Sequence, residues 1–389
     1  MKAAVLSSLL FGLAAASPLA VNKRQDLPIE DYGAAVAAGA DSSDGPPVGD
    51  AVPESAATYD PTSVAADIVA QVSDAAPADA TSAELISADI KKRVAVCTTR
   101  TFNGPQVTAP ADTPEAFQAN TAFSDAAVAG ASAASVPAGY AVVPGYENLK
   151  AAAQDPSYLT YVSSKLTSYS PAQCGALCDA LSGCSSFTIF YERVPLVVSS
   201  TTQVPDKDSC PGLTTSPSAT LIKCAFYGMP LIASTATNVG QFQGKFKVVY
   251  AGVTAFTKSS APSVDGYEGP VSFGNASINA PAPVIDHGYL RVQTFGTNVP
   301  YDPSLCAASC AAQTTYNANH GTFNGQACIF FNAYILYKNG ENGVFTCAYY
   351  GTPYGVAYAK NKGQFDAAGN KFTIGSSFGY YLDGHYVAK

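Results

Sequence analysis

The sequence is poor in several residue types. Its 389 residues include no tryptophan, two methionines and three histidines, and charged residues make up only 13% of it. So few histidines leave little material for histidine-based metal sites or acid–base catalysis. The net charge is −8 and no basic patch is present, which argues against binding to nucleic acid or to anionic membrane surfaces. No glycine-rich phosphate loop follows a predicted strand, so we expect no cofactor.

Long apolar runs are also missing, except near the first residue. Residues 1–16 combine a positive Lys2, an apolar stretch and small residues before Ala16, which predicts a secretory signal cut after Ala16. A membrane span needs about 20 apolar residues, and the last residues lack the hydrophobic tail of a lipid-anchor signal. We therefore expect no membrane anchor and a protein that is secreted, extracellular or associated with the cell wall.

An acidic block follows the predicted signal. Residues 25–90 contain 13 acidic residues and no lysine or arginine. Such a composition buries too little apolar surface to offset its ordering entropy. Dibasic sites that end at Arg24 and Arg93 flank the block, and secretory processing proteases cut after such sites. We expect residues 17–93 to be an acidic, disordered pro-segment; the alternative is a retained acidic linker.

An internal repeat organises the rest of the chain, which holds all ten cysteines. Ser170-Pro171 and Asp302-Pro303 each predict the start of a helix, with a capping residue followed by proline. Gln173 would complete a capping box in the first copy. Two cysteines follow each cap at four and eight residues, on one helical face. These are Cys174 and Cys178, then Cys306 and Cys310.

The most specific match lies later in each copy. Residues 224–230, CAFYGMP, repeat as residues 347–353, CAYYGTP, and an Asn-x-Gly-Gln-Phe element follows each, at 238–242 and 361–365. Asparagine and glycine tolerate positive φ, so the element predicts a turn; a ligand contact is the alternative. A closing strand is expected from Phe246 to Tyr250 in the first copy and from Phe372 onward in the second.

These patterns predict an α+β fold. It would consist of two tandem, disulfide-tied units, each with a helix packed on a small antiparallel sheet. The first unit would span 141–258 and the second 266–389, after an N-terminal extension at 94–140.

The cysteines admit more than one explanation. Ten cysteines beside a predicted secretory signal indicate disulfides, but the possible pairings are too many for the sequence to settle. A zinc or iron–sulfur site is the alternative, because two cysteines on a helix face can ligate a metal.

The cysteine-bearing helix, the cysteine-led strand and the later strand cysteine resemble the PAN/apple superfamily. The tandem arrangement and the two repeated elements are similar to secreted apple-like proteins of filamentous fungi. The resemblance covers roughly 141–389 and departs from typical apple domains in an insertion at 194–221 and in a missing flanking cysteine pair. It implies the bridges Cys178–Cys184 with Cys174–Cys224, and Cys310–Cys328 with Cys306–Cys347. Cys97 and Cys210 are then left for each other.

Few residues suggest chemistry. Residues 375–379, GSSFG, fit the nucleophile-elbow pattern, but Asp383 and His385 lie too close to Ser377, which aligns opposite Ala251 in an ordinary strand. The tyrosines of the last forty residues could stack on sugars, although a half-buried core explains them better. Asn275 is the one glycosylation sequon. No catalytic or metal-binding residue is predicted.

The resemblance implies a non-catalytic binding protein that contacts carbohydrate or extracellular protein at a cell wall or a host surface. Two similar units on one chain would raise avidity if both bind at once. A secreted hydrolase of polysaccharide or ester substrates, whose acids converge only in the fold, and a structural matrix protein are the alternatives.

Overall fold

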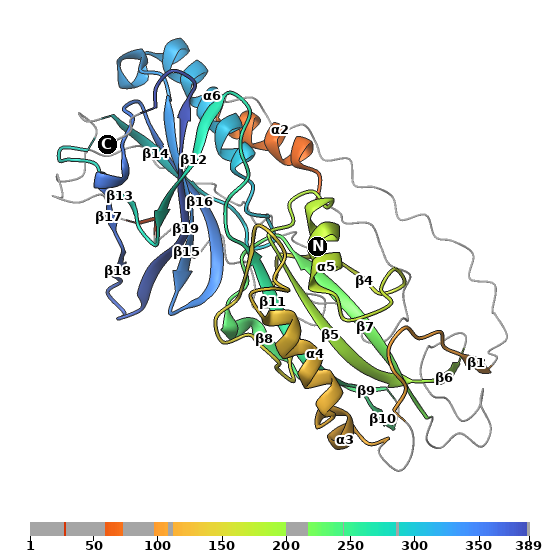
Figure 1. The fold of residues 1–389 in the computed structure, drawn as a ribbon. Coiled ribbons are helices and arrows are strands. Elements are labelled where there is room, and N and C mark those ends of the chain that lie inside the picture. The colour runs from red at the N-terminus through yellow and green to blue at the C-terminus, as the bar shows by residue number, and fades with distance from the viewer. Residues whose placement is uncertain are drawn as a thin grey trace, which may run out of the picture.

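The computed structural model describes residues 27–28, 59–72, 97–107, 112–199, 217–243, 245–284 and 288–386. Two antiparallel sheets with helices against them dominate it, which confirms the predicted α+β class (Figure 1). The predicted processing positions Ala16, Arg24 and Arg93 lie outside the described residues, as does Cys210.

The first sheet has five strands in the order β2-β11-β5-β7-β4. Helix α5 lies against it (Figure 1). The elements are β2 Tyr140–Val142, β4 Tyr158–Val162, α5 Pro171–Asp179, β5 Ser186–Pro195, β7 Ser218–Tyr227 and β11 Val249–Lys258. Every residue of β5 and β7 is buried, because side chains cover both faces of these central strands. The insertion after Val194 leaves the pairing of this hairpin intact, since the two strands pair along all ten residues.

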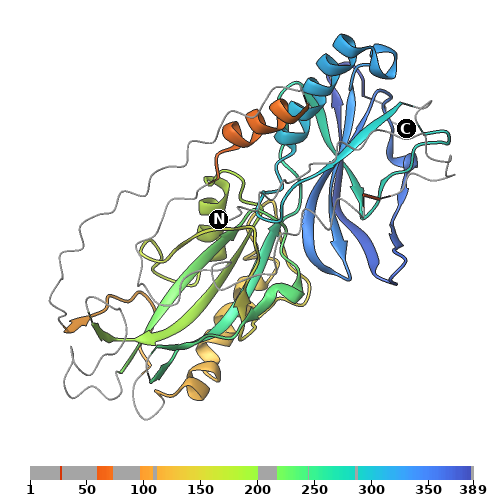
Figure 2. The ribbon, with the colours of Figure 1, turned by 180° about the vertical axis from the view of Figure 1, so that it is seen from behind.

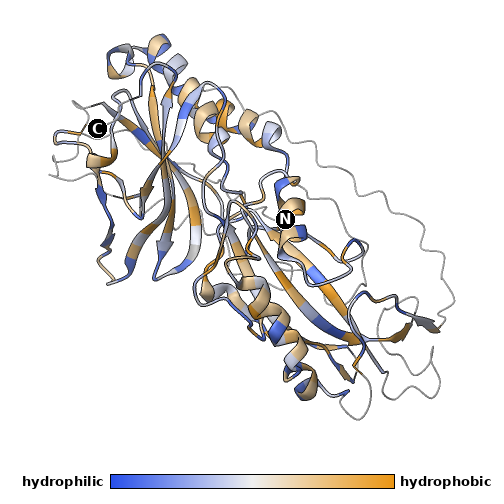
Figure 3. Cartoon of the chain, in the orientation of Figure 1, coloured by the Kyte–Doolittle hydropathy of each residue, from blue (hydrophilic) through white to orange (hydrophobic). Residues whose placement is uncertain are grey.

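The second sheet has its strands in the order β12-β19-β15-β16-β14, and β18 pairs with β19. Helix α6 lies against it, and Figure 2 shows the sheet from behind. The elements are β12 Tyr267–Gly274, β14 Tyr289–Thr294, α6 Pro303–His320, β15 Phe330–Lys338, β16 Glu341–Tyr350, β18 Gly363–Phe365 and β19 Lys371–Leu382. Apolar residues run along the strands of both sheets (Figure 3).

Both sheets follow one connection scheme. In each, two strands precede a helix, three strands follow it, and the last strand lies between the first and the third. Short elements connect these parts: β3 Ala152–Ala153, β6 Val197–Ser199, η1 Ala233–Thr235, β8 Ala236–Asn238, β9 Phe242–Gln243, β10 Phe246–Lys247, β13 Ser277–Ile278, η2 Thr322–Gly325, η3 Val356–Tyr358 and β17 Ala359–Asn361. The closing strand of the first sheet thus begins at Val249, three residues later than expected.

Two disulfides tie each of the helices α5 and α6 to its sheet. They are Cys174–Cys224, Cys178–Cys184, Cys306–Cys347 and Cys310–Cys328. These are the pairs that the resemblance implies. Cys97 is also disulfide-bonded, whereas its expected partner Cys210 lies outside the described residues.

The segment before the first sheet is part of its core. It contains β1 Cys97–Thr99, α3 Pro114–Gln118 and α4 Thr121–Ala131. Phe117 and Phe123 are fully buried on the face of the sheet that carries the disulfides, and Phe123 stacks on Tyr191 with ring centroids 4.2 Å apart. The boundary between extension and first unit therefore does not separate two packing units.

The expectation of disorder does not hold for residues 59–72. Helix α2, Pro61–Val72, is ordered and packs on α6. Composition averaged over the whole acidic block hides this helix, because its residues carry a single acid, Asp67, and a stripe of apolar side chains.

The predicted helix caps are largely correct. Ser170 and Asp302 accept hydrogen bonds from the amides of Gln173 and Ser304, at 3.3 and 3.0 Å. The capping box is wrong, because the Gln173 side chain donates instead to the carbonyl of Lys165.

Candidate functional site

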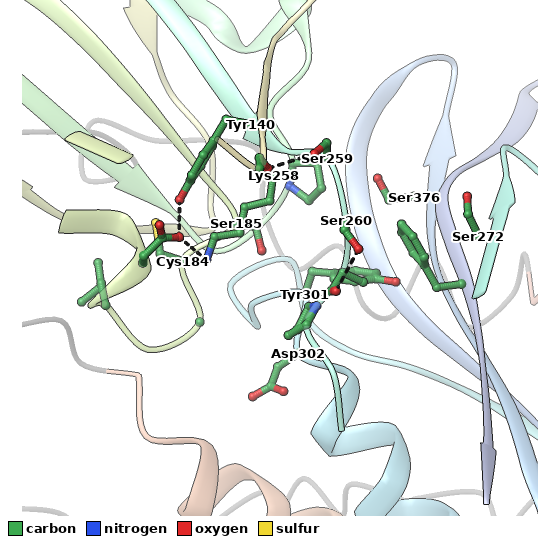
Figure 4. A pocket seen from close by; sticks show the side chains of 18 of the residues that line it. Tyr140, Cys184, Ser185, Lys258, Ser259, Ser260, Ser272, Tyr301, Asp302 and Ser376 are labelled. Carbon is green, nitrogen blue, oxygen red and sulfur yellow. Dashed lines mark hydrogen bonds and ion pairs between the residues drawn. The ribbon is translucent and has the colours of Figure 1, made fainter. Parts of the chain in front are cut away.

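A pocket lies where the two sheets meet (Figure 4). It is an open pocket of about 700 Å³, and both halves of the chain line it. Tyr140, Lys258 and Ser185 lie on the first side, and Ser272 and Ser376 lie across from them on the second (Figure 4). The pocket is a shared feature, because neither sheet alone would form it.

A tyrosine–carboxylate–lysine network lines the first side. The hydroxyl of Tyr140 donates to Asp179 Oδ1 at 2.8 Å, and Lys258 Nζ lies 3.3 Å from the same oxygen. The three residues stand at the start of β2, the end of α5 and the end of β11, so the fold brings three element ends together. Burial and the bond to Asp179 raise the pKa of Tyr140, so its hydroxyl remains a donor at neutral pH.

Hydroxyl groups and the aromatic rings of Tyr301 and Phe378 line the second side. Ser272 and Asn275 are exposed at the end of β12, while Ser376 and Phe378 of β19 are half-buried. Serines 182, 259 and 260 add hydroxyls from the loops of the first side and the linker. The lining thus offers many donors and acceptors beside an apolar surface of about equal extent.

Ser376 has a strained backbone. Its φ is +46°, in the left-handed region that side chains other than glycine rarely adopt. The matching position of the first sheet holds Gly252, with φ +62°. Both residues lie within the register shift between the last strand and the central strand. The second sheet therefore has a serine side chain at a backbone position with positive φ, whereas the first sheet has glycine, which adopts this conformation without strain.

This match corrects the sequence alignment of the repeats. Val248 N donates to the carbonyl of Gln241, and Phe372 pairs with Gln364, so Val248 rather than Phe246 corresponds to Phe372. Ser377 is consequently not opposite Ala251. Aligning Phe246 with Phe372 is wrong by two residues, because Phe246 belongs to the short strand β10 and not to the closing strand β11.

The junction between the two sheets is tightly packed. The amide of Tyr301 donates to the carbonyl of Gly228 at 2.7 Å, and a Cβ on Gly228 would lie 2.8 Å from Pro300. Met229 is buried in the core on the α6 side of the second sheet. Glycine is therefore needed at this position of the CAFYGMP element, because a side chain would collide with Pro300 of the other half.

The residues singled out from the sequence have different fates. Asn275 is exposed at the pocket rim. Ser377 is buried and accepts a hydrogen bond from Asn332, so it is not presented as a nucleophile. His385 is exposed away from the pocket, and His320, another of the three histidines of the chain, stacks on Tyr316. Tyr358 and Tyr386 are exposed, whereas the other five late tyrosines are core residues: Tyr349, Tyr350, Tyr354, Tyr380 and Tyr381.

The Asn-x-Gly elements form turns of one geometry. Asn238 and Asn361 accept hydrogen bonds from the amides of Gly240 and Gly363. Each turn leaves its phenylalanine 68% exposed, at Phe242 and Phe365. The sequence predicted the turn but not this exposure, which the repeated phenylalanine after a turn could have signalled.

Among the described residues, no group of three or more histidine, cysteine, aspartate or glutamate side chains is placed to hold a metal ion. Within the same ranges, no helix is both long and apolar enough to cross a membrane. Comparisons of the chain with protein-family models, curated proteins and solved structures found no match.

Proposed function

We propose that this chain is a secreted, non-catalytic binding protein made of two apple-like units in tandem. Its ligand would be carbohydrate at a cell wall or a host surface, held in the pocket between the units. The shared strand order and the matched disulfides support the tandem arrangement. The observation that carries the function is the open junction pocket, to which both units contribute.

The lining of this pocket suits sugar hydroxyls. Asp179 and Lys258 provide an acceptor and a donor side by side, and the surrounding serines provide both. Phe378 supplies an apolar face for sugar C–H groups. The strained Ser376 adds support, since backbone strain of order 1–3 kcal/mol tends to persist at functional positions.

Binding explains the carboxylates of this pocket better than hydrolysis does. A glycosidase needs two carboxylates free to act on one bond. Here Asp179 already binds Tyr140 and Lys258, while Asp302 caps α6 and accepts hydrogen bonds from the amide and the hydroxyl of Ser304. Both acids have structural partners, which favours a binding role over the hydrolase alternative.

The test is ligand retention by protein cut after Arg93. A glycan array and wall-polysaccharide pull-downs identify the sugar, and Lys258→Ala is then compared with Lys245→Ala, an exposed lysine away from the pocket. Lys258→Ala should lose at least tenfold in affinity and Lys245→Ala should not.

Ser376→Gly should change stability and ligand retention in opposite directions. It should stabilise the fold by about 1 kcal/mol, because glycine relieves the left-handed strain, and yet weaken ligand retention. Equal retention by all three variants and the parent protein would exclude this pocket.

A further inference from the structure

Helix α2 lies on the second unit through one apolar stripe. Ile68 is only 3% exposed and belongs to the core cluster that contains the α6 cysteines, and Val64 and Ala65 pack against that cluster. These positions recur at helical spacing, whereas the neighbouring Val69 is 39% exposed. In Figures 1 and 2, α2 (orange) lies alongside α6.

Tyr59, just before α2, anchors the helix at the junction pocket. Its hydroxyl donates to Asp302 Oδ2 at 2.6 Å, and its ring fits against Gly183, where a Cβ would lie 2.7 Å away. Asp302 caps α6, and both Gly183 and Asp302 line the pocket. Tyr59 therefore touches one pocket residue from each unit.

The other end of α2 meets a cation. Gln71 and Val72 line a hollow of about 360 Å³ together with Arg291. Arg291 lies 4.7 Å from the centre of the Tyr349 ring and donates to Gln293 and Ser309, and its Nε makes no hydrogen bond to the described residues. A cation is favourable near a helix C-terminus, and Arg291 lines the same hollow as the C-terminal end of α2.

The acidic segment touches the second unit at another place. Leu27 is 5% exposed within the core on the face of the sheet that does not carry the disulfides, and its amide donates to Gln364 Oε1 at 3.1 Å. Two separate stretches of one segment thus bind the same unit, as a ligand would.

We propose that the α6 face beneath α2 is a protein-binding surface, and that its occupant is this chain's own segment 59–72. Cleavage after Arg93 turns that tethered helix into a separate peptide. A free helix of twelve residues is marginal in water and must pay its ordering entropy on binding. The cut segment therefore stays bound at high concentration and leaves on dilution, which uncovers α6 and frees Gly183 and Asp302 at the pocket rim.

The experiment follows the segment without any sugar present. Full-length protein is cut with a protease specific for dibasic sites, and native mass spectrometry measures the retained segment from 100 μM down to 0.1 μM. Parent protein should retain it at the upper end and release it on dilution. Ile68→Asp should weaken retention at least tenfold, whereas Val69→Asp, with the same charge on the exposed side, should match the parent.

Arg291→Met changes the surface on which α2 lies rather than α2 itself. It should weaken retention several-fold and reduce its dependence on salt. Loss of the segment from cut parent protein at 100 μM, or equal retention by Ile68→Asp and Val69→Asp, would overturn the proposal. That release of the segment opens the pocket to a ligand rests on the proposed function. Retention of the segment is measured without sugar and does not rest on it, so the two proposals can fail separately.

Discussion

The buried ion pair of the first unit is specific to that copy. Lys223 Nζ lies 2.7 Å from Glu192 Oε2, and both side chains are at most 1% exposed. Cys224 pairs with Ile189 as Cys347 pairs with Ala333, so Leu336 and Thr346 occupy the matching positions of the second unit. The sheet therefore does not require ions at these sites.

This comparison predicts a non-additive pair of substitutions. Glu192→Leu alone leaves a buried ammonium without its carboxylate and should destabilise the fold by about 3–5 kcal/mol. Adding Lys223→Met should recover most of that loss, because the charge is removed and a side chain of similar length remains. Urea unfolding of both variants is the measurement; a double variant no more stable than Glu192→Leu would contradict the account.

Asp112 gives the first unit an acid sensitivity. Burial alone would raise the pKa of its carboxyl, but hydrogen bonds from Ser218 and Arg193 hold it below the usual 3.8. A lowered pKa contributes stability above the unfolded-state pKa, and this stability is lost as pH falls through the folded-state pKa. The contribution should therefore be complete at neutral pH and disappear below about pH 4.

The matched measurement compares thermal unfolding of the parent and Asp112→Asn between pH 7 and pH 3. Asp112→Asn should be less stable at pH 7, and the difference should shrink as pH falls. A difference that stays constant over this range would show that Asp112 does not titrate with folding.

At the scale of elements, the Asn-x-Gly turns depend on a close backbone approach. A Cβ on Gly240 would lie 2.1 Å from the carbonyl oxygen of Val248, and one on Gly363 would lie 2.1 Å from that of Phe372. Both glycines also have positive φ, at +92° and +135°. The two repeats thus share a turn that only glycine can make.

Gly363→Ala should accordingly destabilise the second unit by more than about 2 kcal/mol, because strain and collision add. Gly369→Ala is the control, since Gly369 has φ +82° but a Cβ there would meet no atom within 4 Å, and it should cost only about 1 kcal/mol. Chemical denaturation distinguishes them; equal losses would show that the close approach is not limiting.

How far the elements follow from the sequence depends on local signals. Caps at Ser170 and Asp302, and strands after Cys184 and Cys328, carry their own residue patterns and are found where expected. Helix α2 was not predicted because the composition of the whole acidic block hides its apolar stripe, and because Ile68 is buried by residues far away in the sequence. The correspondence of Ser376 with Gly252 was not predicted, because a bulge shifts the register within β19.

At the scale of the whole molecule, the candidate site was beyond local inference. Tyr140, Asp179 and Lys258 are far apart in the sequence and meet only through the packing of β2, α5 and β11. The residues opposite them belong to another sheet, and their approach depends on contacts such as that between Gly228 and Tyr301. The sequence repeat predicts two similar units. It does not predict how the two sheets pack against each other, and the pocket depends on that packing.

The stoichiometry of sugar binding tests the proposed function most directly. The proposed pocket, which both sheets line, would hold one sugar per chain, whereas two independent apple-like sites would hold two. Calorimetric titration of protein cut after Arg93, with the oligosaccharide chosen from the array, measures this number directly. The account predicts one saturable site, lost in Lys258→Ala and retained in Lys245→Ala, with the sugar recovered intact. Two sites per chain, binding unchanged in Lys258→Ala, or sugar cleavage abolished by replacing one aspartate or glutamate would contradict it.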